Sequence, residues 1–284
     1  MKTVIYYDYV RNRKSLLQNL LVWVILFLLL FLVSLITEKV IPGFNREYLK
    51  WSDMAKDLLA MGSWNNHMYV NLWQIVSLVF PVCVVYIVMN GLARTVVQEE
   101  RLETMVFLQN MSVGRVQALI GKLLFWIGYA FIIYVALLLE NILFFLISGS
   151  GYNLSILVSY YGMLFLVTMI YLMIALFLSS YAKHESGCAN ATAWILFLSL
   201  LLSKVGAFVH FVVDLMVMKG QEGDIIGKVD GIGDKLDVLI AICPVSWCWS
   251  GVEVTGTYLV SGIVLACMLC AGAIWIYKSR RDFL

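Results

Sequence analysis

Charged residues are scarce in this sequence, and their scarcity limits the class of protein. Asp, Glu, Lys and Arg make up 13% of the 284 residues, whereas ordinary soluble domains carry about 25%. Hydrophobic residues make up 62%, so a soluble fold could not cover its surface with polar groups. The net charge of +2 gives no indication of nucleic acid or another acidic partner. The composition excludes a soluble enzyme and predicts an all-α integral membrane protein.

Catalytic and metal-binding motifs are missing as well. The sequence has no G-x-S-x-G, H-E-x-x-H or Walker A pattern, and hence no nucleophile elbow, zinc pair or phosphate loop. Its three histidines fall in separate loops or span ends. Glu99 and Glu100 resemble the glutamate pair of CAAX-type membrane proteases, but Thr104 stands where that family needs arginine. We therefore expect no catalytic residue and no metal site in this chain.

Proline and cysteine are also few. Pro81 interrupts an apolar run and predicts a kink, because it removes one helical hydrogen bond. Cys243 and Cys248 lie on the predicted outer side, either as a disulfide or, in the preferred interpretation, as two reduced packing residues. The stretch DGIGD at 230–234 lacks the regular ligand spacing of a calcium loop, so we expect a solvated turn there.

Long apolar runs dominate what is present. A helix needs about 20 residues to cross a hydrocarbon core, and such runs lie at 17–37, 71–93, 118–147, 154–180, 187–210 and 255–277. We therefore expect one domain, 1–284, with six transmembrane helices. A shorter run at 238–250 contains Pro244 and predicts a re-entrant outer hairpin.

Residues 1–16 combine tyrosines with Arg11, Arg13 and Lys14 ahead of the first run. Such a segment is expected to form an elbow helix in the lipid headgroup layer, with a frayed basic terminus as the alternative. Cations before the first span predict a cytoplasmic N-terminus, and six spans then place the C-terminus on the same side. We expect a multi-pass protein of the bacterial cytoplasmic membrane.

Polar residues within the apolar runs are candidates for a substrate pathway. Glu140 and Asn141 lie near the outer end of the third predicted span, and Lys204 lies near the outer end of the fifth. Glu140 and Lys204 either pair across an outer cavity or extend separately to the outer headgroups, and the second interpretation is slightly favoured. Pro81 completes this predicted set.

The inner segment 94–117 is longer than a connection between two spans requires. It opens with a dense cluster of charges, and a short helix with an incomplete apolar face follows. Because that helix offers both charge and apolar surface to the cytosol, we predict that it docks a cytosolic protein.

The layout, together with the stretch EERLETMVFLQNMSVGRVQALIGKLL at 99–124, resembles the permease subunit of ABC-2 type transporters. Members of that family carry here an acidic-basic cluster, a Thr-Leu-Glu-type helix, a Pro-x-Ser-Arg turn and a Gly-Lys pair. The matching residues are Glu99, Glu100, Thr104, Arg115, Gly121 and Lys122. The sequence departs from the family pattern at Glu103, Ser112 and Gly114, where members carry glycine, proline and serine.

The resemblance implies that 94–117 is a coupling loop whose helix is received by an ATP-binding subunit. The implied ATPase-coupling residues are Glu99, Glu100, Arg101, Glu103, Thr104, Arg115, Gly121 and Lys122. This chain would hold no cofactor, since ATP and Mg²⁺ would bind to two copies of a separate ATPase. A second permease chain, identical or related, would complete an exporter of an amphipathic substrate such as an antimicrobial peptide or a lipid-like molecule. The alternative is a non-transporting scaffold or sensor that recruits a cytosolic protein through the same loop.

Overall fold

The computed structural model describes residues 2–40, 72–101, 114–148, 154–182, 184–218, 224–236, 239, 243–244, 247 and 256–279. Within these ranges all regular structure is helical and no strand occurs, which confirms the all-α prediction. Four segments of these helices are long and apolar enough to cross a membrane: Val116–Glu140, Tyr161–Tyr181, Glu185–Val217 and Leu259–Ser279. The chain is a helical membrane protein.

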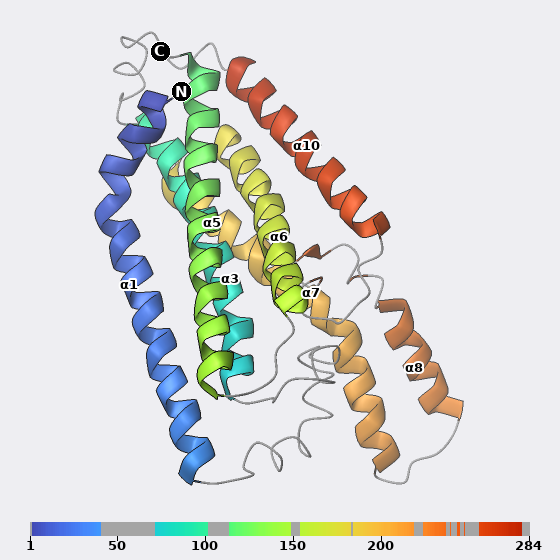
Figure 1. Cartoon of the computed structure of the whole chain (residues 1–284). Helices are drawn as coiled ribbons and strands as arrows, with labels where there is room; N and C mark the ends of the chain where they lie inside the picture. The colour runs from blue at the N-terminus through green and yellow to red at the C-terminus, as the bar shows by residue number, and fades with distance from the viewer. Residues whose placement is uncertain are drawn as a thin grey trace.

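The helices form an antiparallel bundle. In chain order they are α1 (Lys2–Val40), α3 (Leu72–Arg101), α5 (Arg115–Ser148), α6 (Leu154–Tyr181), α7 (Glu185–Met218), α8 (Asp224–Leu236) and α10 (Gly256–Ser279). All but α8 are long, and the long helices alternate in direction, so that both ends of the chain lie at the same end of the bundle (Figure 1). The shortest of them, α10, has 24 residues, and a helix of that length extends about 36 Å against a hydrocarbon core of about 30 Å.

The predicted runs agree in position with these helices. The runs at 118–147, 154–180, 187–210 and 255–277 correspond to α5, α6, α7 and α10, which contain the four candidate spans. The runs at 17–37 and 71–93 fall largely within α1 and α3. The apolar windows found in the described parts of α1 and α3 are shorter, Leu16–Leu26 and Val82–Gln98. The first and second spans therefore stay predictions.

The core lies where α3, α5 and α6 meet. Val88 and Leu92, four residues apart on α3, are fully buried. Gly91 lies between these two residues in sequence. It leaves room for the indole of Trp126 on α5, since an added Cβ at Gly91 would clash with that ring. Trp126 Nε1 donates a hydrogen bond to Thr95 Oγ1 over 3.1 Å. A glycine and a hydroxyl thus fix the spacing of α3 and α5 at their centre.

The N-terminal segment differs from its prediction. The sequence predicts a separate elbow at 1–16, but α1 runs without interruption from Lys2 through the first predicted span to Val40. Neither proline nor glycine occurs between residues 1 and 41, so the backbone contains no residue that would end the helix. The cations of the segment lie on a continuous helix rather than on a separate interfacial one.

The acidic outer segment also differs from its prediction. The sequence predicts a solvated turn at 230–234, but these residues lie inside α8, which packs against the end of α7. Gly233 lies under the His210 ring, where an added Cβ would come within 2.7 Å. His210 Nδ1 hydrogen-bonds to Asp230 Oδ1 over 2.8 Å. This contact with α7 stabilises a glycine-containing helix that would be weak in isolation.

Most of the predicted re-entrant hairpin at 238–250 lies outside the described residues. A disulfide between Cys243 and Cys248 stays untested, because Cys248 is among the residues that the structure does not describe. Trp247 is described and is buried against the main core. The hairpin therefore stays a prediction, with one anchor point in the bundle.

Candidate functional site

The predicted coupling loop is bounded by the end of α3 and the start of α5. Residues 94–101 belong to α3 and residues 115–117 belong to α5, so the connection itself is shorter than the predicted 94–117. Glu99, Glu100 and Arg101 lie in the last turn of α3, and Arg115 begins α5, although the structure does not describe their side chains. Glu103 and Thr104 lie outside the described residues.

A buried ion pair joins the start of α5 to α1. Lys122 Nζ donates a hydrogen bond to Asp8 Oδ1 over 3.3 Å, and their side chains are 2% and 1% exposed. Burial raises the pKa of Asp8, and the charges of Lys122 and Arg11 oppose that rise. Because a single buried charge costs several kcal/mol, each of the two residues needs the other in this position.

Gly121, the residue before Lys122, also permits α1 and α5 to lie close together. An added Cβ at Gly121 would lie 2.9 Å from Val4 Cγ1 of α1. Val4 is fully buried and packs against Ala118, one turn earlier on α5. A side chain at Gly121 would therefore separate the two helices.

The same stretch of α1 also reaches α3. Arg11 Nη2 donates a hydrogen bond to Gln98 Oε1 over 2.9 Å. Gln98 lies in the last turns of α3, just before the loop, whereas Lys122 lies just after it. We call this set of contacts the N-terminal clamp, which joins Val4, Asp8 and Arg11 of α1 to Gln98, Gly121 and Lys122.

Two of the predicted coupling residues, Gly121 and Lys122, make their contacts within the N-terminal clamp. Both are buried against α1, so neither the backbone at Gly121 nor the side chain of Lys122 faces outward to a partner subunit. Any part that they play in coupling acts through α1. The sequence analysis missed Asp8, although it is the one acid before Glu38 and shares a helical face with Val4 and Arg11.

A weaker contact links α3 to α7 at the same end of the bundle. Arg94 Nε lies 4.0 Å from Glu185 Oε1 and donates a hydrogen bond to Asn90 Oδ1 over 3.2 Å. Exposed ion pairs of this kind contribute about 0–1 kcal/mol. The N-terminal clamp is therefore the stronger connection around the loop.

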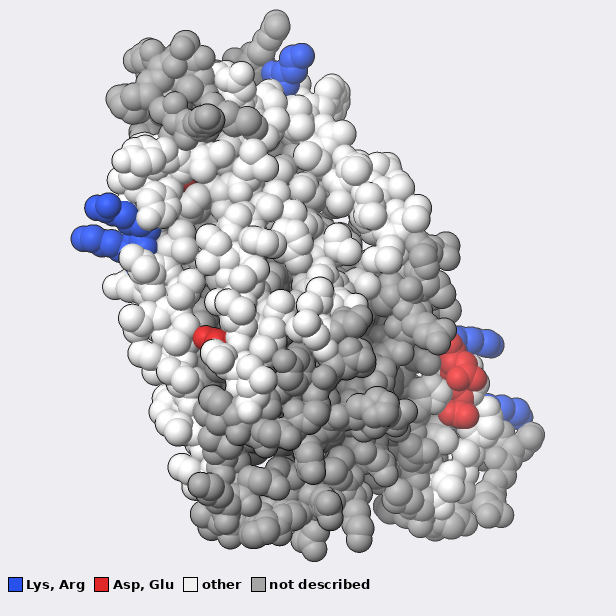
Figure 2. All heavy atoms as spheres, viewed as in Figure 1, with Lys and Arg blue, Asp and Glu red and all other residues white. Residues whose placement is uncertain are grey.

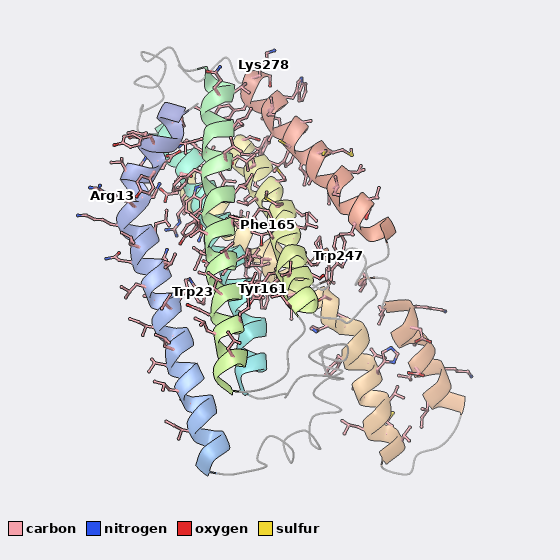
Figure 3. All side chains as sticks on the ribbon, viewed as in Figure 1. Arg13, Trp23, Tyr161, Phe165, Trp247 and Lys278 are labelled. Carbon is pink, nitrogen blue, oxygen red and sulfur yellow. The ribbon has the colours of Figure 1, made fainter. Side chains whose placement is uncertain are left out.

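Charged side chains are few on the visible face. Figure 2 shows Lys and Arg side chains projecting where α1 lies and at the upper end of the bundle, a mixed group of acids and cations over α8, and one acidic patch on the otherwise uncharged described surface between them. Arg13 projects outward from α1 (Figure 3). This distribution suits a chain whose middle is surrounded by hydrocarbon.

The predicted pathway residues lie on α3, α5 and α7. Glu140 lies on α5, half-buried, and its Oε2 has no hydrogen-bond partner among the described residues. It lies within electrostatic range of Tyr161 on α6. Lys204 lies on α7, and a Glu140–Lys204 pair stays a prediction. The side chains of Asn141 and Pro81 are not described.

A polar cluster lies between α5 and α6, and Tyr161 is its member within electrostatic range of Glu140. The Tyr134 hydroxyl shares a 2.7 Å hydrogen bond with Thr168 Oγ1, deep between these helices. The rings of Tyr134 and Tyr161 lie 6.5 Å apart. Periodicity cannot reveal this cluster, because each member alone is an ordinary aromatic or small polar residue in an apolar helix.

No protein-family model matches this chain, and no curated protein sequence matches it. Its class therefore follows from composition and fold, which define a helical membrane protein with four candidate spans among its described residues.

Proposed function

We propose that this chain is the permease subunit of an ABC-2 type transporter, with six transmembrane helices in a bacterial cytoplasmic membrane. In this proposal α1 and α3 provide the spans at 17–37 and 71–93. The alternating long helices and the position of both termini at one end of the bundle support an even number of spans (Figure 1). The cations that precede the first span support a cytoplasmic location for that end.

The observation that carries the proposal is the N-terminal clamp. A transporter driven by a separate ATPase must convert a push on a cytoplasmic loop into movement of its spans. The N-terminal clamp binds α1 to the helices on both sides of the loop, through Gln98 and Lys122. A force on the loop would therefore move α1, α3 and α5 together instead of being absorbed by flexible chain.

The proposed partners are two copies of an ATP-binding subunit and a second permease chain, identical or related. The ATPase subunits hold ATP and Mg²⁺, and this chain is a non-catalytic subunit. The charges around the end of α3 and in the loop, from Glu99 to Glu103, are the proposed docking surface.

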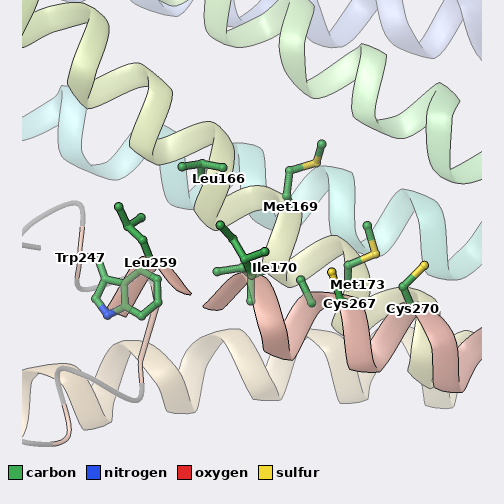
Figure 4. Close-up of a pocket in the computed structure, with 10 residues that line it drawn as sticks. Leu166, Met169, Ile170, Met173, Trp247, Leu259, Cys267 and Cys270 are labelled. Atoms are coloured by element: carbon green, nitrogen blue, oxygen red, sulfur yellow. The ribbon is translucent and has the colours of Figure 1, made fainter. Parts of the chain in front are cut away.

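The proposed substrate is amphipathic, an antimicrobial peptide or a lipid-like molecule. An apolar cavity of about 220 Å³ supports this class, and it lies between α6 and α10 (Figure 4). Met169, Met173 and Ile263 are among its lining residues, and Trp247 of the predicted hairpin borders it. A cavity of this composition suits the hydrocarbon part of a substrate rather than an ion.

Purification of the tagged chain from its native membrane tests the docking surface. We expect a stoichiometric protein with a Walker A sequence to accompany the wild type. We expect the double charge reversal Glu100→Lys with Glu103→Lys to lose that protein, because it places cations where the partner meets acids. A matched reversal of Lys228 and Lys235 to Glu, on α8 at the far end of the bundle, should retain it.

Loss of the partner in both double variants, with both chains folded, would contradict the docking assignment. Recruitment of a cytosolic protein without a nucleotide site would instead favour the scaffold function. Once a substrate is identified, the Glu100→Lys, Glu103→Lys chain should fold and yet fail to couple ATP hydrolysis to transport.

A further inference from the structure

A groove runs along the outside of α1, between its N-terminal half and α5. Its volume is about 420 Å³. The residues that border it are Tyr6, Tyr9 and Leu16 of α1 with Phe125, Gly128 and Ile132 of α5. Apart from the tyrosine hydroxyls, these side chains are apolar. Tyr129 of α5 also borders the groove, which therefore offers space for hydrocarbon beside three tyrosine side chains.

The space arises from a missing side chain. The N-terminal clamp holds α1 against the first turns of α5, where Gly121 lets the helices meet. Two turns further along α5, Gly128 has nothing within 4 Å of the position where a Cβ would lie. The two glycines thus have opposite roles, since one permits contact and the other leaves a gap.

Exposed cations of α1 lie between Tyr9 and Leu16 in sequence, both of which border the groove. Arg13 follows Tyr9 by one turn and so lies on the same side of α1, and Lys14 is next to it. Both side chains are exposed, and Arg13 projects into the surroundings of the bundle (Figure 3). Asp8, the one acid of this segment, is buried against Lys122 and does not neutralise them.

We propose that this groove binds an anionic phospholipid. One acyl chain lies between α1 and α5 over Gly128, and the headgroup phosphate meets Arg13 and Lys14. The tyrosine hydroxyls lie at the boundary between chain and headgroup, where amphipathic rings are stable. Charge complementarity selects the lipid, because an apolar groove bordered by a cationic helix segment matches an acyl chain with a phosphate. The inference goes beyond the transport function and requires only that the chain resides in a membrane.

Native mass spectrometry of the purified full chain tests the groove itself. The chain is equilibrated with equal amounts of phosphatidylglycerol and phosphatidylethanolamine that have matched acyl chains. Because a Cβ at Gly128 meets nothing within 4 Å, Gly128→Leu projects a side chain into the gap, and we expect it to reduce retained phosphatidylglycerol several-fold. Gly162→Leu on α6 is the matched control, because its Cβ also meets nothing within 4 Å and it does not border the groove. Equal retention by the two variants would overturn the proposal.

A second variant removes charge and tests whether the lipid headgroup binds at Arg13 and Lys14. Its result does not depend on whether the chain folds with leucine at position 128. Arg13→Gln with Lys14→Gln should reduce the preference for phosphatidylglycerol over phosphatidylethanolamine by about tenfold or more, since each cation near an anionic surface contributes roughly fivefold. Lys228→Gln with Lys235→Gln on α8 should leave that preference unchanged. A preference that survives the α1 change, or that is absent from the wild type, would overturn the assignment of an anionic lipid.

Discussion

Replacement of Lys122 by methionine should destabilise the N-terminal clamp by an amount that depends on pH. The variant leaves the Asp8 carboxyl group buried without its cation, and Oδ2 already has no hydrogen-bond partner among the described residues. The carboxylate can lose its charge by taking up a proton, which at pH 7 costs about 4 kcal/mol for an acid whose ordinary pKa is near 3.9. We therefore expect Lys122→Met to cost about 3–4 kcal/mol at pH 7, as found for broken buried ion pairs.

The sign of the pH dependence follows from the pKa of Asp8. Burial raises it, and Lys122→Met removes the larger of the two charges that oppose the rise, leaving that of Arg11. A carboxyl group with a raised folded-state pKa favours folding at low pH, and that advantage is lost as pH rises through the folded-state value. The cost of Lys122→Met should therefore shrink by up to about 1.4 kcal/mol per unit as pH falls from 7 to 5. Asp8→Leu leaves the ammonium group of Lys122 buried without its carboxylate, and it should also cost stability.

Hydrogen exchange of the backbone amides in residues 2–16, followed by mass spectrometry in detergent micelles, measures the opening of the N-terminal clamp. Protection is compared at each pH after correction for intrinsic exchange rates. The double variant Asp8→Leu, Lys122→Met is the control, because apolar replacement of both partners is commonly neutral or stabilising. Wild-type protection in Lys122→Met at pH 7, or a loss of protection in that variant that does not shrink between pH 7 and pH 5, would refute the assignment of the pair.

Three further predictions concern helix contacts. Gly121→Ala should cost about 1–3 kcal/mol through the conflict with Val4, and Val4→Ala should restore much of the lost protection in the same exchange experiment. Gly91→Ala should lower the thermal unfolding temperature more than Gly121→Ala, because its Cβ meets a core indole at 2.1 Å; an equal shift would contradict the packing of that core. His210→Leu should release α8, so that limited trypsin digestion cuts within α8 faster, whereas Asp230→Asn, which keeps a hydrogen-bonding side chain, should have the smaller effect.

The long helices were predictable because each is encoded by a continuous run of apolar residues in the sequence. A run of apolar residues long enough to cross a bilayer has few alternatives to a helix, and α5, α6, α7 and α10 lie where the runs predicted them. Helix ends were harder to predict. The segment 94–101 contains several charges and reads as a loop, yet in the structure it continues α3.

The N-terminal clamp was not predictable in the same way. Asp8 and Lys122 lie 114 residues apart in sequence, and no periodicity aligns one helix with another at that distance. The Gly-Lys pair at 121–122 was recognised only as a resemblance, whereas its contact with Val4 and Asp8 is a property of the fold. The error at 230–234 has a similar origin, because the contact of Gly233 with His210 favours helix where glycine alone favours a turn.

The distance between Asp8 and Lys122 along the chain also sets the order of events during synthesis. Ribosomes add about 5–20 residues per second, so roughly 6 to 23 s separate the synthesis of the acid from that of its cation, 114 residues later. Throughout that interval the carboxylate must remain hydrated, because Lys122, the cation with which it is buried, has not yet been made. The first helix can therefore take its final position only after the third predicted span has been made. A bulky tag fused immediately before Val4 would interfere with this last step of assembly rather than with insertion of the spans.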